Sequence, residues 1–272
     1  MQFSDSHIVA PGERSLGVDT AAYLAEAVAF VNTLQPAPDY AVVTGDLVNG
    51  GLRCEYAHFV DLMHGLRVPY FAIMGNHDER GAFHAGLPPA VYGRAPAGSI
   101  RYAVDDFPLR FIGLDANPPR RSRWPIPSLD AGSLAWLETT LAGAPAQPTL
   151  LAVHQPPFRT GLHYFDIFGY PGARRLRSIV RAAPQVGRVI CGHIHCVKTL
   201  ALGGTLVCSA PSTAPQRVPE LFEHRILGLR HEVPGFTVHD WSAQHAFSST
   251  VYRRVARATF AAQAALPLAT RR

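Results

Sequence analysis

Metal-ligand side chains recur in this chain directly after short apolar runs. The hexapeptide CGHIHC, residues 191–196, places two histidines between two cysteines just after Val189 and Ile190. Four soft ligand atoms within six residues raise the hypothesis of a closed structural zinc site. Other apolar runs along the chain, however, are also followed by ligand-type residues, namely Asp5, His7, Asp46, Asn76 and His154.

Together with His193 and His195 these residues form a set of nitrogen and oxygen donors, which suits zinc, manganese, iron or cobalt. Seven ligands are too many for one tetrahedral ion, but suffice for two ions that share a carboxylate and keep open positions. Alternate residues of an extended segment point to one side, so we expect His193 and His195 to face one cleft. Cys191 and Cys196 are then better interpreted as small buried apolar residues.

Each short motif also has a plainer interpretation. Gly-Asp after a strand is an ordinary turn, Asn and Asp are common turn formers, and His154 alone would suit a buried, hydrogen-bonded histidine. The ordered recurrence of such residues at strand ends is what favours a metal site. Glycines at 45, 75 and 192 also precede them and would allow the backbone to approach an ion closely.

The elements that would position these residues alternate between strand and helix. Buried strands are predicted at 40–43, 70–73, 150–153 and 189–190. Apolar residues at helical spacing predict helices over 24–34, 59–66 and 134–141, the first one capped by Asp19. Such alternation is typical of βαβ units, in which ligands bind at the carboxyl ends of the strands.

Composition describes an ordinary globular protein of 272 residues, with 47% hydrophobic and 17% charged residues. The 25 basic and 20 acidic residues give a net charge of +5, and the scattered basic residues predict a solvated surface rather than a nucleic-acid groove. Four cysteines do not indicate a disulfide framework. No membrane span and no signal peptide are expected, so the predicted location is the cytoplasm.

Two stretches depart from the α/β rhythm. Residues 116–130 contain several prolines and arginines and predict a surface excursion. We expect residues 1–215 to form the catalytic domain and 216–272 to form a small C-terminal appendage. This appendage, with a helical tail from about Thr250, is predicted to be a cap or an oligomerisation segment that makes the protein a homo-oligomer.

The ordered blocks Asp-x-His, Gly-Asp, Gly-Asn-His-Asp, His and Gly-His-x-His run from residue 5 to residue 195. In this order they resemble the calcineurin-like metallophosphoesterase superfamily. Within it the chain is similar to the class III cyclic-nucleotide phosphodiesterases and the bacterial glycerophosphodiesterase branch. The resemblance implies an α/β fold with a four-layer αββα sandwich.

The resemblance also implies roles for individual residues. One divalent ion would be held by Asp5, His7, Asp46 and His195, and a second by Asp46, Asn76, His154 and His193. His77 would lie beside the substrate phosphate without binding metal, so Asn76 and His77 are expected substrate contacts, and His77 and Asp46 are the expected catalytic residues. The second histidine that often follows the position of His154 is Gln155 here.

The implied activity is hydrolysis of a small-molecule phosphodiester, of the cyclic-nucleotide or glycerophosphodiester type, by a hydroxide that bridges two divalent metal ions (Fe, Mn, Zn or Co). His77 would hydrogen-bond a phosphoryl oxygen or protonate the leaving group. A phosphomonoesterase on the same core, with Arg120, Arg121 and Arg123 at its rim, is an alternative. A non-catalytic scaffold of the same fold is another, although such scaffolds typically lose ligands that are all present here.

Overall fold

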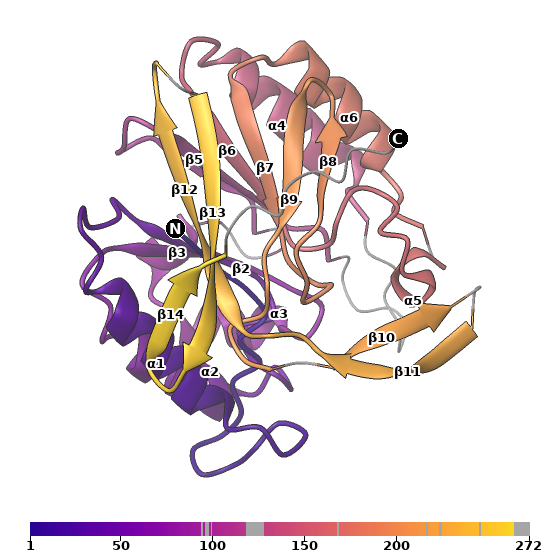
Figure 1. Ribbon diagram of the computed structural model, residues 1–272. Helices are drawn as coiled ribbons and strands as arrows, with labels where there is room; N and C mark the ends of the chain where they lie inside the picture. Colours follow the sequence, from indigo (N-terminus) through magenta and orange to yellow (C-terminus); the bar gives the residue numbers. More distant parts are fainter. Residues whose placement is uncertain are drawn as a thin grey trace.

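Two six-stranded sheets form the centre of the molecule (Figure 1). The computed structural model describes residues 1–93, 95, 98, 100–117, 128–167, 169–215, 217–222, 225–244 and 246–263, with backbone only for 217–231. The first sheet has the order β14-β13-β12-β1-β2-β3. Its strands are β1 (Gln2–Phe3), β2 (Ala41–Thr44), β3 (Tyr70–Ile73), β12 (Gly235–Ser242), β13 (Ala246–Ala256) and β14 (Thr259–Ala262).

The second sheet has the order β4-β5-β6-β7-β9-β8. Its strands are β4 (Tyr102–Val104), β5 (Arg110–Leu114), β6 (Thr149–Val153), β7 (Val186–Cys191), β8 (Thr199–Leu202) and β9 (Thr205–Ser209). The neighbours β1, β2 and β3 run parallel, and so do β5, β6, β7 and β9. The carboxyl ends of the parallel strands in each sheet therefore share an edge.

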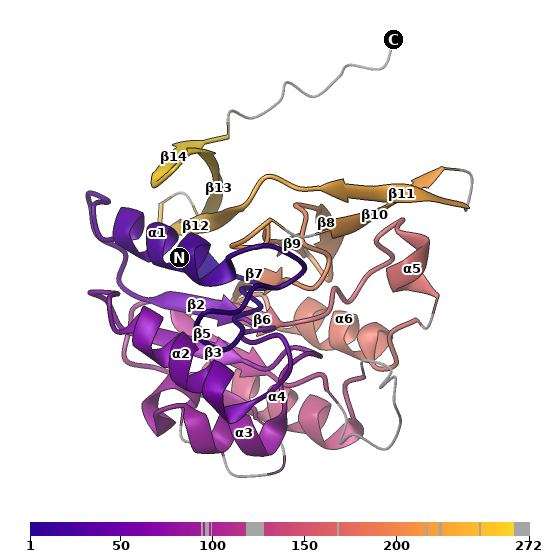
Figure 2. The ribbon, with the colours of Figure 1, turned by 90° about the horizontal axis from the view of Figure 1, so that it is seen from below.

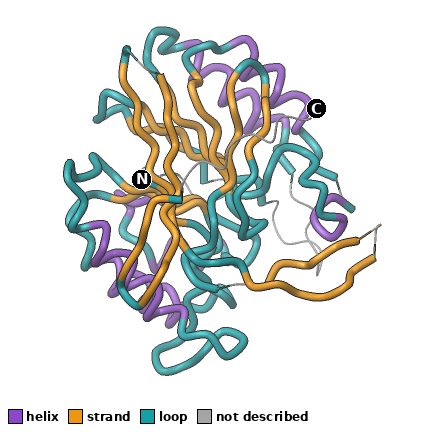
Figure 3. The backbone as a smooth tube through the Cα atoms, in the orientation of Figure 1, coloured by secondary structure: helices purple, strands orange, loops and turns teal. Residues whose placement is uncertain are grey.

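Helices cover the outer faces of both sheets (Figure 3). On the first sheet lie α1 (Thr20–Val31), α2 (Arg53–Met63) and α3 (Arg80–Gly86), with a 3-10 turn at Pro89–Tyr92. On the second lie α4 (Ala131–Ala142) and α6 (Ala173–Ala182), while the short α5 (His163–Asp166) belongs to the loop after β6. The result is the four-layer αββα arrangement that the family resemblance implied.

Two apolar clusters hold the layers together. The larger one joins the helices of the first sheet to side chains between the two sheets, such as Phe111 and Ile190. The smaller one packs Leu137 of α4 and Ile179 of α6 on the second sheet. The central strands β2, β5 and β6 are covered on both faces and consist entirely of buried residues, as expected for parallel strands.

Most of the predicted elements are confirmed. The predicted strands correspond to β2, β3, β6 and β7, and the predicted helices to α1, α2 and α4. The Asp19 carboxylate accepts a hydrogen bond from the N–H of Ala22 and so caps α1 as expected. The predicted excursion at 116–130 falls mostly on residues outside the described part of the chain.

The last three strands of the chain join the first sheet. Strand β12 pairs antiparallel with β1, Gln2 opposite Thr237, and β13 and β14 extend the same sheet. Residues 235–262 therefore complete the first sheet. The helical tail predicted from about Thr250 is wrong, because that residue lies within β13, which pairs with β12 and packs the Tyr252 ring against Phe30 of α1.

A separate hairpin precedes these strands. Strands β10 (Arg217–Phe222) and β11 (Arg225–His231) pair only with each other in the described chain. Figures 1 and 2 show this hairpin extending from the sandwich on the side of α5. Within the described residues, the structure contains no helix with the length and apolar character needed to cross a membrane.

Candidate dinuclear metal centre

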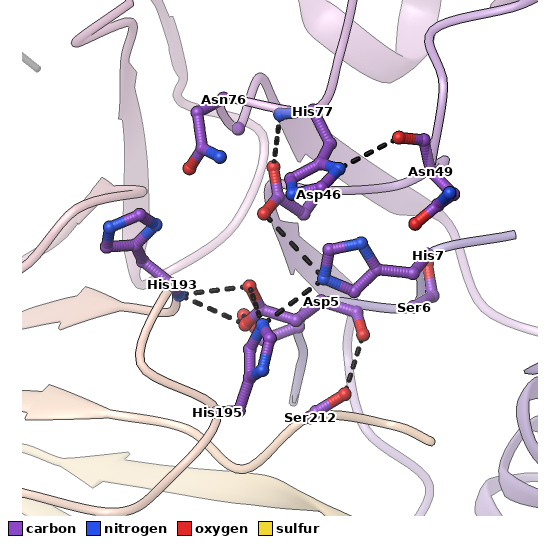
Figure 4. A network of polar contacts seen from close by, with 12 residues as sticks. Asp5, Ser6, His7, Asp46, Asn49, Asn76, His77, His193, His195 and Ser212 are labelled. Atoms are coloured by element: carbon purple, nitrogen blue, oxygen red, sulfur yellow. Dashed lines mark hydrogen bonds and ion pairs between the residues drawn. The ribbon is translucent and has the colours of Figure 1, made fainter. Parts of the chain in front are cut away.

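The carboxyl ends of five strands, from both sheets, meet at one edge of the sandwich. Figure 4 shows Asp5, His7, Asp46, Asn76, His77, His193 and His195 gathered there. Asp5 and His7 follow β1, Asp46 follows β2, and Asn76 and His77 follow β3. From the second sheet, His154 follows β6, and His193 and His195 follow β7. The structure thus brings together all of the residues that the sequence predicted for the site.

The first group of donor atoms comprises Asp5, His7, Asp46 and His195, one atom from each lying within 4.8 Å of the others. The Nε2 atoms of His7 and His195 are 3.2 Å apart. His7 Nε2 is 3.8 Å from Asp46 Oδ2, and His195 Nε2 is 3.5 Å from Asp5 Oδ1. Two imidazoles and two carboxylates therefore face one point.

The second group comprises Asp46, His154 and His193, again with donor atoms within 4.8 Å of one another. His154 Nε2 lies 3.3 Å from Asp46 Oδ2 and 3.2 Å from Asn76 Oδ1, so the amide oxygen joins the group. His154 Nδ1 is 2.7 Å from the Thr44 carbonyl, which can only accept a hydrogen bond, so Nδ1 is protonated. This contact fixes the ring with Nε2 toward the site. Asp46 is common to both groups.

The backbone at this edge is strained. Among the described residues, eight other than glycine have positive φ, and five of them belong to the donor set: Asp5 at 51°, His7 at 45°, Asp46 at 51°, His193 at 70° and His195 at 54°. Such conformations cost roughly 1–3 kcal/mol each and cluster at functional sites. The segment of His193 and His195 is therefore not extended as expected, but the two side chains still face the same site. Through their left-handed conformations they reach different donor groups.

Two glycines permit the close approach of the strand ends. A Cβ atom on Gly75 would overlap Asp46 Oδ1 and the Asp46 backbone nitrogen. A Cβ on Gly192 would overlap Ser4 Oγ and lie 2.7 Å from Asp5 Oδ2. The residues before the donors are thus glycine because side chains would occupy the space of the donor atoms themselves.

The donor groups are buried, which determines their protonation. Burial opposes ionisation of Asp46, but His154 and the other histidines around it keep the pKa of this carboxyl well below its ordinary value. Burial lowers the pKa of His7 and of His193 to about 3, so both imidazoles are neutral and able to donate lone pairs. Burial also lowers the pKa of His154, but Asp46 beside it outweighs this and raises the pKa to about 9. A cation bound there would take the place of the His154 proton.

His77 lies beside the first group without joining it. Its ring meets that of His7 edge-on with centroids 4.6 Å apart, and its backbone N–H donates to Asp46 Oδ1 at 2.8 Å. His77 Nδ1 lies 2.8 Å from the Asn49 carbonyl, so Nδ1 must be protonated and Nε2 is left for other partners.

Sequence reasoning missed several residues that support the donors. Ser4 Oγ donates to the Asp5 carboxylate at 2.5 Å, and Ser212 Oγ donates to the Asp5 carbonyl at 2.7 Å. Asp78, the last residue of the Gly-Asn-His-Asp block, accepts from Gly75 N–H and from the Tyr56 hydroxyl. It therefore braces the loop after β3. Ser4, Ser212 and the Asn49 carbonyl have no sequence pattern that would have identified them as supports of the site.

Metal ions fit this arrangement. Two ionised carboxylates and four imidazoles converge in a buried region, and such a set of oxygen and nitrogen donors is suited to divalent cations of the first transition row or zinc. Cys191 and Cys196 are buried and lie in neither donor group, so CGHIHC is not a closed zinc site.

Comparisons with known proteins agree with the geometry. The sequence is 29% identical over 251 residues to a probable glycerophosphodiester phosphodiesterase of Arcobacter nitrofigilis, covering 92% of this chain and 90% of the relative. It is 32% identical to a glycerophosphodiester phosphodiesterase of Enterobacter lignolyticus (78% and 76% covered). It is 28% identical to a 3',5'-cyclic adenosine monophosphate phosphodiesterase of Escherichia coli (93% and 88% covered).

Solved structures share the fold. A dimetal phosphatase from Danio rerio superposes with a TM-score of 0.59 at 16% identity, covering 82% of this chain and 92% of that one. A purple acid phosphatase from yellow lupin also gives 0.59 at 16% identity, covering 93% of this chain and 50% of that one. The sequence profile described as calcineurin-like phosphoesterase matches residues 1–197. The chain belongs to the calcineurin-like phosphoesterase family.

Proposed function

We propose that this protein is a hydrolase of phosphodiesters that uses two divalent metal ions. The observation that carries the proposal is the pair of donor groups sharing Asp46. A single structural ion would need only one such group, whereas two-metal sites are suited to phosphate ester hydrolysis. The named relatives are phosphodiesterases, which favours a diester as substrate.

Asp5, His7, Asp46 and His195 would hold the first ion, and Asp46, Asn76, His154 and His193 the second. Bound ions would activate water as a nucleophile near neutral pH and offset the charge on the phosphate oxygens. The left-handed turns hold the donors in place before any ion arrives, which reduces the reorganisation needed on binding. We assign no single metal, because Fe, Mn, Zn and Co all suit this donor set.

His77 contributes the substrate contact. Its Nδ1 hydrogen is committed to the Asn49 carbonyl, so only Nε2 can face the phosphate. To donate a hydrogen bond or a proton there, the ring must be doubly protonated, in which form Asn49 keeps it oriented. Asn76, half-buried beside the second donor group, is the other proposed substrate contact.

A substrate panel tests the proposal. The protein, stripped of metal and reloaded with Mn, Zn, Co or Fe in turn, should hydrolyse bis(p-nitrophenyl) phosphate faster than p-nitrophenyl phosphate. A preference for the monoester would favour the phosphomonoesterase alternative, whose expected rim of Arg120, Arg121 and Arg123 lies outside the described residues. Full metal occupancy without hydrolysis of either ester would favour the scaffold alternative.

We also propose that the protein assembles as a homo-oligomer through the segment after residue 215, and assign the contact to the β10–β11 hairpin. The support is topological: the hairpin pairs with neither sheet in the described chain, while residues 235–262 are already used within the first sheet. The predicted division at residue 215 remains a prediction.

A further inference from the structure

A cavity of about 320 Å³ opens beside the second donor group. Its walls come from the loop after β6, from α5 and from the start of α6, and His193 forms part of its lining. A phosphodiester bound at the donor groups would therefore extend one of its two alcohol portions into this space. The volume is at the lower end of the range for small-molecule sites.

Gln155, which lines this cavity, has a side-chain oxygen that accepts no hydrogen bond among the described residues. Gln155 follows His154 directly and is 3% exposed. The Met74 carbonyl accepts from Asn117 Nδ2, so Asn117 Oδ1 must accept from Gln155 Nε2 at 2.9 Å. This chain of bonds fixes the amide orientation and leaves Gln155 Oε1 buried without a partner among the described residues. A buried carbonyl of this kind requires a donor, such as a hydroxyl group.

The outer part of the cavity is cationic. Arg159, Arg174 and Arg177 line it, all three are exposed, and no acidic partner is found for any of them in the described part of the chain. The one acidic residue of the lining, Asp166, accepts from the N–H groups of Thr160 and Gly161 and from the Thr160 hydroxyl. Its carboxylate thus stabilises the loop through these hydrogen bonds. Arg174 also lies in the first turn of α6, where the helix dipole favours an anion.

We propose that this cavity selects phosphodiesters in which one alcohol portion carries a hydroxyl next to the scissile phosphate and a second negative charge farther out. Gln155 Oε1 accepts from the hydroxyl, and the three arginines bind the distant anion. The half-buried rings of Phe165 and Tyr170 form the wall between them, and the buried Tyr170 hydroxyl is likewise without a partner among the described residues. The inference rests on the proposed function, whose substrate class it narrows.

Two dinucleotides that differ only in a terminal phosphate provide the probe. In pApA the first ribose has a 5'-phosphate, a 2'-hydroxyl and the scissile 3'-phosphodiester, whereas ApA lacks the 5'-phosphate. At low salt we expect kcat/KM for pApA to exceed that for ApA by about tenfold, because pApA has the lower KM. The difference between the two substrates should shrink as added salt screens the arginines. The double variant R174Q/R177Q should bring the ratio close to one. R175Q is the matched control, because Arg175 lies on the same helix but pairs with Glu138 outside the cavity.

The hydroxyl contact is tested with the 2'-deoxy dinucleotide. We expect wild type to show a several-fold higher KM for deoxy-ApA than for ApA, since a buried acceptor then loses its donor, and the substitution Gln155→Leu should remove this difference. Equal KM values for pApA and ApA, or a preference that survives in R174Q/R177Q, would overturn the proposed selection.

Bis(p-nitrophenyl) phosphate carries neither a hydroxyl group nor a second charge. Its hydrolysis therefore tests the proposed function independently of the cavity inference. R174Q/R177Q should cleave it at the wild-type rate. If wild type cleaves it but neither dinucleotide, the cavity inference is wrong and the proposed function stands. If wild type cleaves none of these esters, the proposed function fails. The cavity inference is then tested by calorimetric binding of pApA and ApA, and equal affinities for the two would contradict it.

Discussion

Asp46 is the residue on which both donor groups depend. Its carboxylate is buried, approaches His154 Nε2 at 3.3 Å and His7 Nε2 at 3.8 Å, and accepts the N–H of His77. Asp46→Asn keeps the size and removes the charge. We expect it to lower the affinity for both ions and to reduce diester hydrolysis by about 10³-fold or more.

Metal analysis after dialysis checks this prediction, with Asn76→Ala as the comparison because Asn76 lies in the second group only. Asp46→Asn should lose both equivalents of metal and Asn76→Ala no more than one. Retention of two tightly bound ions by Asp46→Asn would show that the carboxylate is not shared between them.

A substitution of His77 distinguishes a role in substrate chemistry from a role in metal binding at the same site. Because it belongs to neither donor group, His77→Ala should keep the wild-type metal content. Loss of its hydrogen bond or proton to the phosphate should lower kcat by about 10²-fold. Metal content and kcat, measured on the same preparation, check this expectation, and unchanged turnover at full occupancy would contradict the role assigned to His77.

At the scale of elements, the turn after β7 holds two donors in strained geometry. Gly192→Ala would place a methyl group against the Ser4 hydroxyl and the Asp5 carboxylate, which are the floor of the first donor group. We expect the free energy of unfolding to fall by about 1–3 kcal/mol, as for other overpacked sites. Chemical denaturation of the metal-free protein measures it.

Gly143→Ala is the matched control, since Gly143 is exposed, has a helical conformation at the end of α4, and its added Cβ would meet nothing closer than 3.6 Å. The free energy of unfolding of Gly143→Ala should stay within about 0.5 kcal/mol of the wild-type value. Equal stabilities of the two variants would mean that the turn has room for a side chain.

An ion-pair cluster joins the first helix to the last strands. Glu26 of α1 accepts from Arg254 Nε at 2.8 Å and from the N–H of Ala258 at 3.0 Å, and Arg257 lies nearby. Partial burial of Glu26 opposes ionisation, but Arg254 and Ala258 outweigh it, so the pKa lies below its ordinary value. The unfolded chain therefore binds the proton first as pH falls, and the stabilisation, present above about pH 4.5, is lost in more acidic solution.

The substitution Glu26→Gln should thus lower Tm at pH 7 and lower it by less at pH 3.5. The pair is partly solvated, so we expect an effect of about 0.2–1 kcal/mol. Thermal melts at both pH values measure it. Glu13→Gln, at an exposed position, is the control and should leave Tm unchanged at both pH values. A Glu26→Gln deficit as large at pH 3.5 as at pH 7 would exclude the ion pair as its cause.

Local patterns predicted the first 210 residues better than the last 60. Donors at strand ends were predictable because glycine, a buried run and a ligand-type residue are adjacent in sequence. The pairing of β12 with β1, Gln2 opposite Thr237, was not, because it joins the two ends of the chain and leaves no local periodicity. The left-handed φ of His193 was equally invisible, since it is uncommon for any residue other than glycine and no local pattern marks it.

At the scale of the whole molecule, the region after residue 215 separates into two parts. Phe236 of β12 and Phe260 of β14 lie in the main apolar cluster, so β12–β14 stabilise the sandwich itself. His239 of β12 also lies 2.9 Å from Gln2 Oε1, and Gln2 Nε2 donates to Thr44 and to the Cys191 carbonyl. The last strands thus brace the strand ends that carry the donors, whereas β10 and β11 pair only with each other in the described chain.

Removing the hairpin therefore tests its role in assembly without disturbing the sandwich. Arg217 pairs with His231, so the two ends of the hairpin lie about 5 Å apart and a short Gly-Ser linker can replace residues 217–231. We expect a Tm within a few degrees of wild type, an unchanged rate on bis(p-nitrophenyl) phosphate, and a solution mass reduced to that of one chain. Light scattering measures the mass. An oligomer that survives the deletion would move the contact to the sandwich, and a variant that fails to fold would mean that the hairpin, like β12–β14, belongs to the packed structure.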